Sequence, residues 1–260
     1  MKAVRKVASY SLPVFVFFAY LFMYVPIIVL VFYSFNGGQS SHQWQGFSLI
    51  WYRELFSSVE ILDALRNSLI VAFSSVALSI VMGLFFVFYS SKNILQKFLF
   101  AFYGSLAAPE VVLAVVLLSF FSFFSVPLGL TTLIAAHTLV ALSYVTPILY
   151  SSFKNINVSI TEASLDLGAT EWQTFKKIIV PLLSPAIMGA ALLVFIVSFD
   201  DFILSFFCSG PSTMTLPMYI FATIRSGATP VINALSTLLL IMSSLVVLVF
   251  TLFRVRTRVF

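Results

Sequence analysis

Residues 159–181, SITEASLDLGATEWQTFKKIIVP, form the longest polar segment in a chain that is otherwise built of apolar runs. Such a segment is expected to lie in water. Ser159 and Glu162 have the three-residue spacing of a capping box, in which each side chain bonds the backbone at the start of a helix. Thr170 and Gln173 have the same spacing. The pattern predicts two short helices.

Gly168 lies between the two expected helices. Glycine adopts the left-handed backbone conformation that closes a helix, so the chain can turn sharply there. Lys176 and Lys177 carry the positive charge that favours the last turn of a helix, and Pro181 is expected to end it. The stretch therefore predicts an elbow of two helices joined at a glycine.

The composition defines the surroundings of this elbow. Of 260 residues, 61% are hydrophobic and 9% are charged, and the mean hydropathy is +1.09. These values exclude a water-soluble domain and predict an integral membrane protein. The net charge of +5 comes from cations at the ends of apolar runs rather than from a basic patch, so no nucleic-acid partner is expected. The single cysteine, Cys208, cannot form an internal disulfide.

The apolar runs predict one domain, residues 1–260, with six membrane-spanning helices. The first run is too long for a signal-peptide core and lacks a cleavage site, so it is expected to remain as an anchor. Between the first two spans, residues 48–56 (SLIWYRELF) predict either a short interfacial helix or a structured loop. The expected spans are residues 10–35, 64–89, 98–124, 130–153, 182–207 and 231–253.

The positive charges orient this arrangement. If both termini are cytoplasmic, eleven Lys and Arg residues lie inside and three lie outside, as the positive-inside rule requires. The elbow then lies in the cytoplasm. The inner residues are Lys2, Arg5, Lys6, Lys92, Lys97, Lys154, Lys176, Lys177, Arg254, Arg256 and Arg258, and the outer residues are Arg53, Arg66 and Arg225.

The elbow resembles the EAA loop of ABC importer permeases, which reads EAA, three residues, G, nine residues, I-x-L-P. Ser164 replaces the third residue of that motif and Val180 replaces its Leu. An ordinary loop between helices is the alternative. The resemblance implies that the loop inserts into a cleft on a separate ATP-hydrolysing subunit. The residues implied in this coupling are Glu162, Ala163, Gly168, Ala169, Trp172, Ile178 and Pro181.

Four ionisable residues lie inside the apolar runs. Glu110 follows Pro109 roughly 20 Å into the third span, near or just beyond the middle of the membrane. Asp200 and Asp201 lie near the outer end of the fifth span, and His137 lies in the outer part of the fourth. Ionisable groups at such depth usually mark a transport pathway. The alternatives are a solvated or capping role for one Asp, and an ordinary polar contact for His137.

The whole chain is similar to the permease subunits of spermidine/putrescine ABC importers, of the PotC type. The segments that carry this resemblance are YVPIIVLVFYSFN (24–36), WQGF (44–47), Pro109-Glu110, SFDDF (198–202) and SGPSTMTLPMYIF (209–221). Glu110 stands where the family more usually has Asp. The resemblance implies the MetI-like fold of type I ABC importer permeases in the bacterial inner membrane. It also implies two ATPase subunits, a second homologous permease and a periplasmic or surface polyamine-binding protein as partners.

The residues agree with a cationic cargo because, apart from Arg66 at the outer end of the second span, each charged residue expected within a span is acidic. Tyr144 could add a cation–π contact worth about 0.5–2 kcal/mol, although packing is its usual role. Importers of ferric ion or thiamine are the nearest alternatives. A channel or proton-coupled carrier would also use intramembrane acids but has no reason to present an elbow. No nucleotide-binding or metal-binding motif is present, so we expect no enzyme activity and no bound cofactor in this chain, with ATP and Mg²⁺ on the ATPase.

Overall fold

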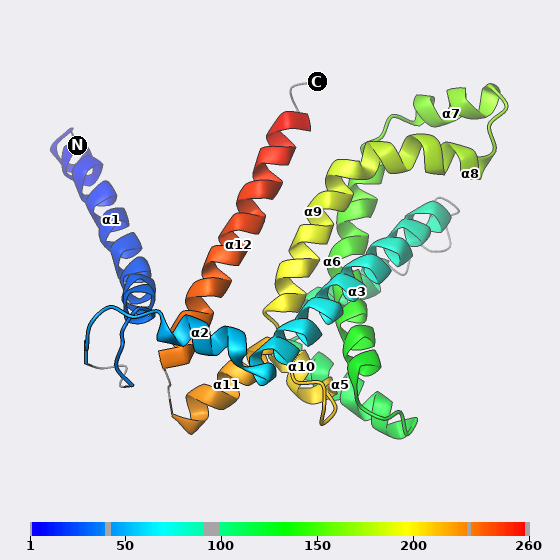
Figure 1. The fold of residues 1–260 in the computed structure, drawn as a ribbon. Coiled ribbons are helices and arrows are strands. Elements are labelled where there is room, and N and C mark those ends of the chain that lie inside the picture. Colours follow the sequence, from blue (N-terminus) through cyan, green and yellow to red (C-terminus); the bar gives the residue numbers. More distant parts are fainter. Residues whose placement is uncertain (1, 40–42, 91–98, 228–229, 258–260) are drawn as a thin grey trace. The chain divides into compact units, whose positions relative to one another are not determined.

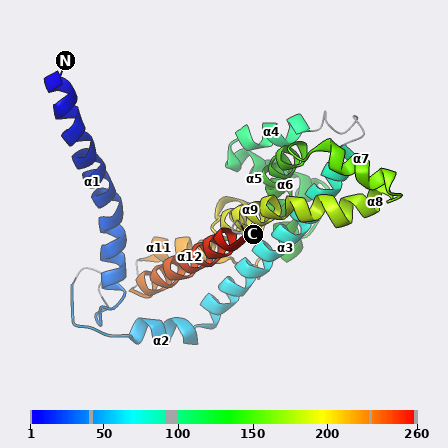
Figure 2. The same cartoon turned by 90° about the horizontal axis from the view of Figure 1, so that it is seen from above.

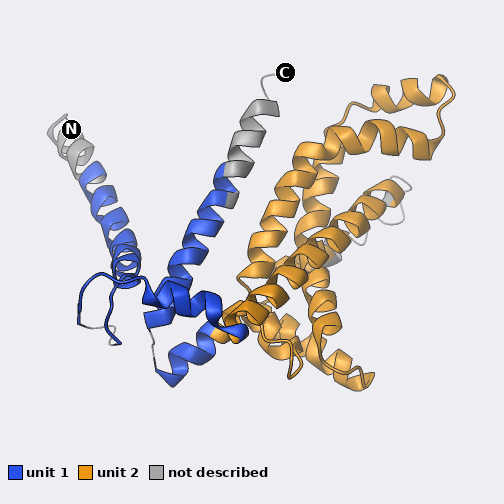
Figure 3. Cartoon of the chain, viewed as in Figure 1, with its two compact units in different colours: residues 1–59, 220–260 blue, residues 60–219 orange. Residues whose placement is uncertain are grey.

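A computed structural model describes residues 2–39, 43–90, 99–227 and 230–257 of the chain (Figure 1). The turn with Lys92 and Lys97 lies outside the described residues, as does Arg258. The chain divides into two compact units, residues 1–59 with 220–260 and residues 60–219 (Figure 3). Nearly all the described structure is helical, and the strand pairing in this part of the chain is an isolated bridge between Asn36 and Phe47.

The first unit contains α1 (Lys2–Tyr33), α2 (Ile50–Ser57) and α12 (Pro230–Thr257). Helix α12 packs against both α1 and α2. Asn36 organises the loop before α2, because its amide donates to the carbonyl of Gln43 and its side-chain oxygen accepts from the backbone of Gln45. The indole of Trp51 donates to the carbonyl of Asn36 at 2.6 Å. The predicted helix within residues 48–56 is therefore confirmed, and its aromatic side chain fixes it to the loop.

The second unit carries the elbow and the intramembrane acids. Its elements are α3 (Val59–Ser90), α4 (Leu99–Ala107), α5 (Glu110–Phe123), α6 (Leu130–Lys154), α7 (Val158–Asp166), α8 (Glu171–Thr174), the π-helical segment η2 (Phe175–Ile179), α9 (Val180–Phe199) and α10 (Ile203–Cys208), followed by α11 (Leu216–Ser226) across the boundary between units. Helix α6 is the centre of this unit, because it packs against α9 along its length and against α4 (Figure 2).

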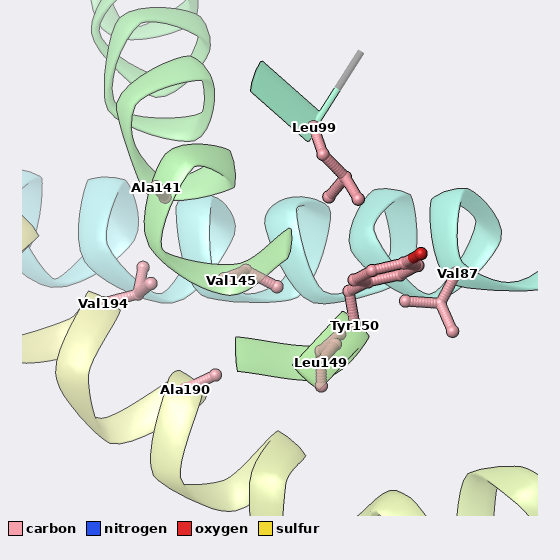
Figure 4. Close-up of a cluster of buried hydrophobic side chains, with 8 residues drawn as sticks. All are labelled: Val87, Leu99, Ala141, Val145, Leu149, Tyr150, Ala190 and Val194. Atoms are coloured by element: carbon pink, nitrogen blue, oxygen red, sulfur yellow. The ribbon is translucent and has the colours of Figure 1, made fainter. Parts of the chain in front are cut away.

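The core of the second unit is made where α3, α4, α6 and α9 meet (Figure 4). Val145 and Leu149 of α6 are fully buried, and Ala190 and Val194 of α9 close against them. The small side chains permit close approach of the helices, which is how membrane helices associate where lipid gives no hydrophobic driving force. Gly83 of α3 shows the same constraint, because an added Cβ there would overlap the side chain of Val145.

Hydrogen bonds place the ends of these helices on two sides of the unit. At one side, Asn67 of α3 donates to the carbonyl of Met214, and Ser68 accepts from the backbone of Leu216. At the other side, the end of α3 lies beside the elbow, since Phe88 is in aromatic contact with Phe175. A membrane-spanning α3 requires its two ends to lie on opposite sides of the unit in this way.

Two of the predicted spans are broken helices. In the third predicted span, α4 ends at Ala107 and α5 begins at Glu110. Pro109 lies between them and cannot donate a backbone hydrogen bond. The fifth ends at Phe199, and α10 starts at Ile203. Among the described residues, four segments are long and apolar enough to cross a membrane: 13–33, 59–89, 130–154 and 171–199. The count of six spans and the cytoplasmic termini stay predictions.

Gly210 supplies a test of the packing at the α10 end of the unit. An added Cβ would overlap the carbonyl oxygen of Leu128, a backbone atom that cannot move aside alone. We expect Gly210→Ala to lower the free energy of unfolding by about 1–3 kcal/mol, as overpacking does. The measurement is the melting temperature of the purified chain in detergent. Gly189→Ala is the control, because no atom lies within 4 Å of its Cβ position; equal melting temperatures would contradict the packing.

Candidate functional site

The elbow forms at the predicted glycine. Gly168 has a φ of +86°, in the left-handed region that favours glycine. Thr170 caps α8 as predicted: its hydroxyl accepts from the backbone of Gln173, whose side chain accepts from the backbone of Thr170. The predicted capping box at Ser159 is wrong, because α7 begins one residue earlier and Asn157 caps it by accepting from the backbone of Ser159. Asparagine is as good an N-cap as serine, and it comes first in the chain.

The predicted helix end at Pro181 is also wrong. Residues 171–199 are helical without a break, passing from α8 through η2 into α9. Within η2 the backbone bonds span five residues, and the N–H of Val180 donates to the carbonyl of Phe175. The wider turn leaves room for the proline ring at the start of α9, where its missing N–H costs little. Lys176 and Lys177 therefore lie within a continuous helix and are exposed.

Two contacts hold the elbow rigid. The hydroxyl groups of Ser164 on α7 and Thr174 on α8 are buried and bonded to each other at 2.9 Å. Trp172 stacks on Phe85 of α3 and on Phe175, with ring centroids 6.2 and 5.8 Å apart. The first contact joins the two arms of the elbow, and the second fixes the elbow to the end of α3. Figure 1 shows α7 and α8 side by side beyond the ends of α6 and α9.

The remaining surface of the elbow is open. Of the predicted coupling residues, Glu162, Ala163, Gly168, Trp172 and Pro181 are exposed, and Ala169 and Ile178 are half-buried. Leu167 is 88% exposed, the largest exposed fraction among the large hydrophobic side chains of the described residues. Sequence reasoning missed it, although a leucine directly before a left-handed glycine was a visible signal. Exposed apolar side chains mark a docking surface where they form a patch, and Leu165, Leu167 and Trp172 of this elbow are all exposed.

Beneath the elbow lies a cavity of about 270 Å³. Its wall is mainly aromatic and aliphatic, with Glu171 as the charged group. The lining residues are Phe88, Phe153, Thr161, Leu165, Glu171, Thr174, Phe175 and Ile179. The elbow thus has both a convex exposed face and a hollow that separates part of it from the helices below.

The two helix breaks bring two of the predicted acids together. Helices α5 and α10 pack against each other, and Ala114 and Leu204 lie in one buried cluster. Glu110 is the first residue of α5, and Asp201 lies just before α10. Their carboxyl groups are close enough to interact directly. Both acids therefore lie at helix N-termini, where the helix dipole favours negative charge.

The adjacent aspartates differ in their surroundings. One carboxylate oxygen of Asp201 accepts from the backbone N–H of Leu204 at 2.9 Å, so Asp201 caps α10, and its carboxyl group also interacts with that of Glu110. Asp201 is 7% exposed, whereas Asp200 is exposed. The two adjacent side chains therefore differ in burial, and Asp201 has the capping role that was the alternative for one of them. Glu110 is exposed within this chain.

His137 and Tyr144 reach the same place from α6. Together with Asp201 and Ser198 they line a cavity of about 10 Å³, which is room for about one water molecule. His137 is buried, and its Nδ1 and Nε2 lie 2.8 and 3.3 Å from the hydroxyls of Ser198 and Ser205. These bonds match the alternative of a satisfied polar contact. The two serines gave no sequence signal, because serines are common in membrane helices.

The structure therefore contains two sites, an exposed elbow and a group of acids at two helix breaks. Within the described part of the chain, no three His, Cys, Asp or Glu side chains cluster as a metal site would require. Glu110, Asp201, His137 and Tyr144 gather near one another, and the elbow lies at the opposite end of α9.

Comparison with known proteins identifies this arrangement. The family model described as "Binding-protein-dependent transport system inner membrane component" matches residues 75–256. In fold, the chain is similar to a bacterial ABC transporter involved in the import of the acidic polysaccharide alginate, with a TM-score of 0.74, 16% identity, and coverage of 100% of this chain and 98% of that one. The fold and the elbow thus define a permease, the membrane component of an ABC importer. The chain belongs to the family of binding-protein-dependent inner-membrane transport components.

Relatives narrow the place of the chain within the family. It is 36% identical to the spermidine/putrescine transport system permease protein PotC of Haemophilus influenzae, over 90% of this chain and 93% of that protein. It is 33% identical to the putrescine transport system permease protein PotI of Escherichia coli K12, over 85% of this chain and 82% of that protein. A second solved alginate transporter, at a TM-score of 0.66 and 20% identity and covering 97% of this chain and 93% of that one, is in complex with a pentasaccharide-bound periplasmic protein.

Because Ser164 and Thr174 are buried and bonded to each other, we expect the stability losses caused by replacing them to be non-additive. We expect Ser164→Ala to lower the free energy of unfolding by about 1–3 kcal/mol, because the hydroxyl of Thr174 loses its partner while buried. Adding Thr174→Val should restore most of that loss, since no polar group then remains unpaired. The melting temperatures of the two single variants and the double variant in detergent measure the coupling. Additive losses would show that the hydrogen bond does not hold the elbow.

Proposed function

We propose that this chain is the permease subunit of an ATP-driven importer of polyamines, spermidine or putrescine, and forms half of the translocation path. The observation that carries the proposal is the pair of carboxyl groups, Glu110 and Asp201, brought together from two broken membrane helices. Discontinuous helices with polar groups at their ends are how membrane transporters build substrate sites. The likeness to PotC and PotI supports the same cargo.

The charge of the site favours a cation. Two carboxylates close together in a medium of low dielectric repel each other, and an ammonium group between them relieves that repulsion. The fold itself does not decide the charge of the cargo, since a transporter of similar fold is involved in the import of an acidic polysaccharide. The acids at the breaks therefore carry the selectivity in this proposal. Tyr144 offers an aromatic surface to the methylene chain or to an ammonium group.

The cavity beside Asp201, of about 10 Å³, is too small for a polyamine, so this proposal requires the breaks to open when cargo passes. Asp201 stays bonded to α10 through the N–H of Leu204, and its carboxyl group interacts with that of Glu110. In this scheme an ammonium group enters between the two carboxyl groups and replaces their direct interaction.

The proposed coupling to ATP hydrolysis uses the elbow. The exposed residues from Glu162 to Trp172, with Leu167 at the turn, form a convex face that fits a cleft on a separate ATPase, which binds ATP and Mg²⁺. Two ATPase copies, a second homologous permease and a periplasmic polyamine-binding protein complete the assembly. This chain itself then binds no cofactor and has no enzyme activity. Importers of ferric ion or thiamine are the competing functions within the family, and the family match argues against an ATP-independent channel or carrier.

Neutralising the acids tests the cargo. We expect Glu110→Gln and Asp201→Asn each to reduce ATP-dependent spermidine uptake by roughly tenfold or more, because a desolvated charge pair that loses one partner costs about 2–5 kcal/mol. Asparagine keeps the oxygen that caps α10, so Asp201→Asn removes charge with little change in shape. The measurement is uptake into proteoliposomes that contain the complete importer at matched levels.

The matched control is Asp200→Asn, which removes the same charge one residue away on an exposed side chain. We expect a smaller effect than for Asp201→Asn. Parallel assays with thiamine and ferric ion distinguish the competing cargoes. Full spermidine uptake by both Glu110→Gln and Asp201→Asn would overturn the cation site, and uptake without ATP would favour a channel or carrier.

Changing Gly168 tests the coupling. Valine is β-branched and avoids a φ of +86°, whereas asparagine tolerates that region. We expect Gly168→Val to abolish most co-purification of the ATPase, and Gly168→Asn to retain it, with equal membrane levels of both variants. The measurement is the subunit composition of the complex purified through a tag on this chain. Full ATPase binding by Gly168→Val would refute the coupling role, and a functional complex with two copies of this chain and no second permease would refute the pairing.

A further inference from the structure

His137 joins the two helices on either side of the second break. Its Nδ1 lies 2.8 Å from the hydroxyl of Ser198, in the last turn of α9, and its Nε2 lies 3.3 Å from the hydroxyl of Ser205, on α10. Asp201 lies between the two serines, three residues after the first and four before the second. A single imidazole on α6 thus spans the non-helical residues 200–202.

Both ring nitrogens of His137 are committed. The neutral ring donates from one nitrogen and accepts at the other, and each serine hydroxyl can take the complementary role. The side chain is 3% exposed, Ser198 is 8% exposed and Ser205 is 1% exposed. With both nitrogens bonded and almost no exposed surface, His137 has no polar atom left to offer to cargo in this arrangement.

The break needs such an attachment. Where α9 ends and α10 begins, backbone groups lose their helical partners, and an irregular segment at membrane depth is tolerated only where protein or a water-filled cavity satisfies it. The cap from Asp201 to the N–H of Leu204 satisfies one donor of α10. That cap holds Asp201 to α10, but it does not hold α10 to α9. The imidazole of His137 adds a contact between the two helices, because it bonds a serine on each of them.

We infer that His137 is a positioning residue for Asp201: by bonding Ser198 and Ser205 at once, it helps to set the angle between α9 and α10 and so holds the carboxyl group of Asp201 toward Glu110 and the cargo. This role rests on the proposed function of Asp201 as a cargo-binding acid. It gives His137 an indirect effect on cargo binding, where the sequence left open direct contact or an ordinary polar contact. It also assigns a function to Ser198 and Ser205.

The two hydrogen bonds of His137 differ in length, so the two serines are expected to differ in how much their substitution affects uptake. The 2.8 Å bond to Ser198 is a normal hydrogen bond, and the 3.3 Å bond to Ser205 is long. Ser198→Ala should therefore raise the half-saturating spermidine concentration more than Ser205→Ala does. His137→Gln should retain part of the function, because an amide also donates and accepts, while His137→Leu should lose it.

A cycle of substitutions separates positioning from a general structural role. We expect His137→Leu to raise the half-saturating spermidine concentration for uptake roughly 5- to 50-fold, the loss typical of a displaced charged partner. In an Asp201→Asn background the same substitution should add less than about twofold, because the group that it positions has already lost its charge. The protein used is the complete importer in proteoliposomes, with ATPase association and membrane levels measured for each variant.

The control is Thr138→Val, next to His137 on α6. Thr138 is similarly buried, but the bond described for its hydroxyl goes to the carbonyl of Ile134 on its own helix. It should change uptake little. If Asp201→Asn impairs uptake and His137→Leu impairs it by the same factor in both backgrounds, His137 acts independently and the positioning role is wrong. If Asp201→Asn has no effect, the proposed cargo site fails instead.

Discussion

Lipid offers no hydrogen bonds, and this constraint governs the architecture of the second unit. Every backbone N–H and C=O at membrane depth needs a partner within the protein, which favours unbroken helices. The chain nevertheless breaks twice, at Pro109 and at Asp200 to Phe202, and Glu110 and Asp201 lie at these breaks. Asp201 caps α10, and His137 bonds serines on both sides of the second break. The groups that stabilise the breaks also make the interior attractive to a cation.

The elbow follows from a different requirement, which is that its shape must be stable in water without a core of its own. A left-handed glycine sets the turn, the Thr170–Gln173 box closes the start of α8, and the buried hydroxyl pair joins its arms. The aromatic contact of Trp172 with Phe85 carries the shape to the end of α3. These contacts leave the convex face free, with Leu167 exposed at its tip.

Features set by local chemistry were predictable from the sequence, and features set by packing were not. Gly168 and Thr170 act through residues at most three positions away, so their roles could be read directly. Ser159 and Pro181 misled the prediction, because an equally good cap, Asn157, lay two residues upstream and because a π-helical turn accommodated the proline. The position of Glu110 and Asp201 within apolar runs was visible in the sequence, but their closeness depends on α5 packing against α10. Nothing near His137 in the sequence points to Ser198, which lies 61 residues away.

The unbroken helix of residues 171–199 has a mechanical consequence. Its 29 residues run from the exposed elbow to the last residue before Asp200 and Asp201, and the helix bends between α8 and α9 (Figure 1). Because η2 replaces the expected stop at Pro181 with a continuous backbone, the elbow and the acid-bearing break are the two ends of one bent helix. A displacement of the elbow can therefore reach the break through a single element, without a relay between helices.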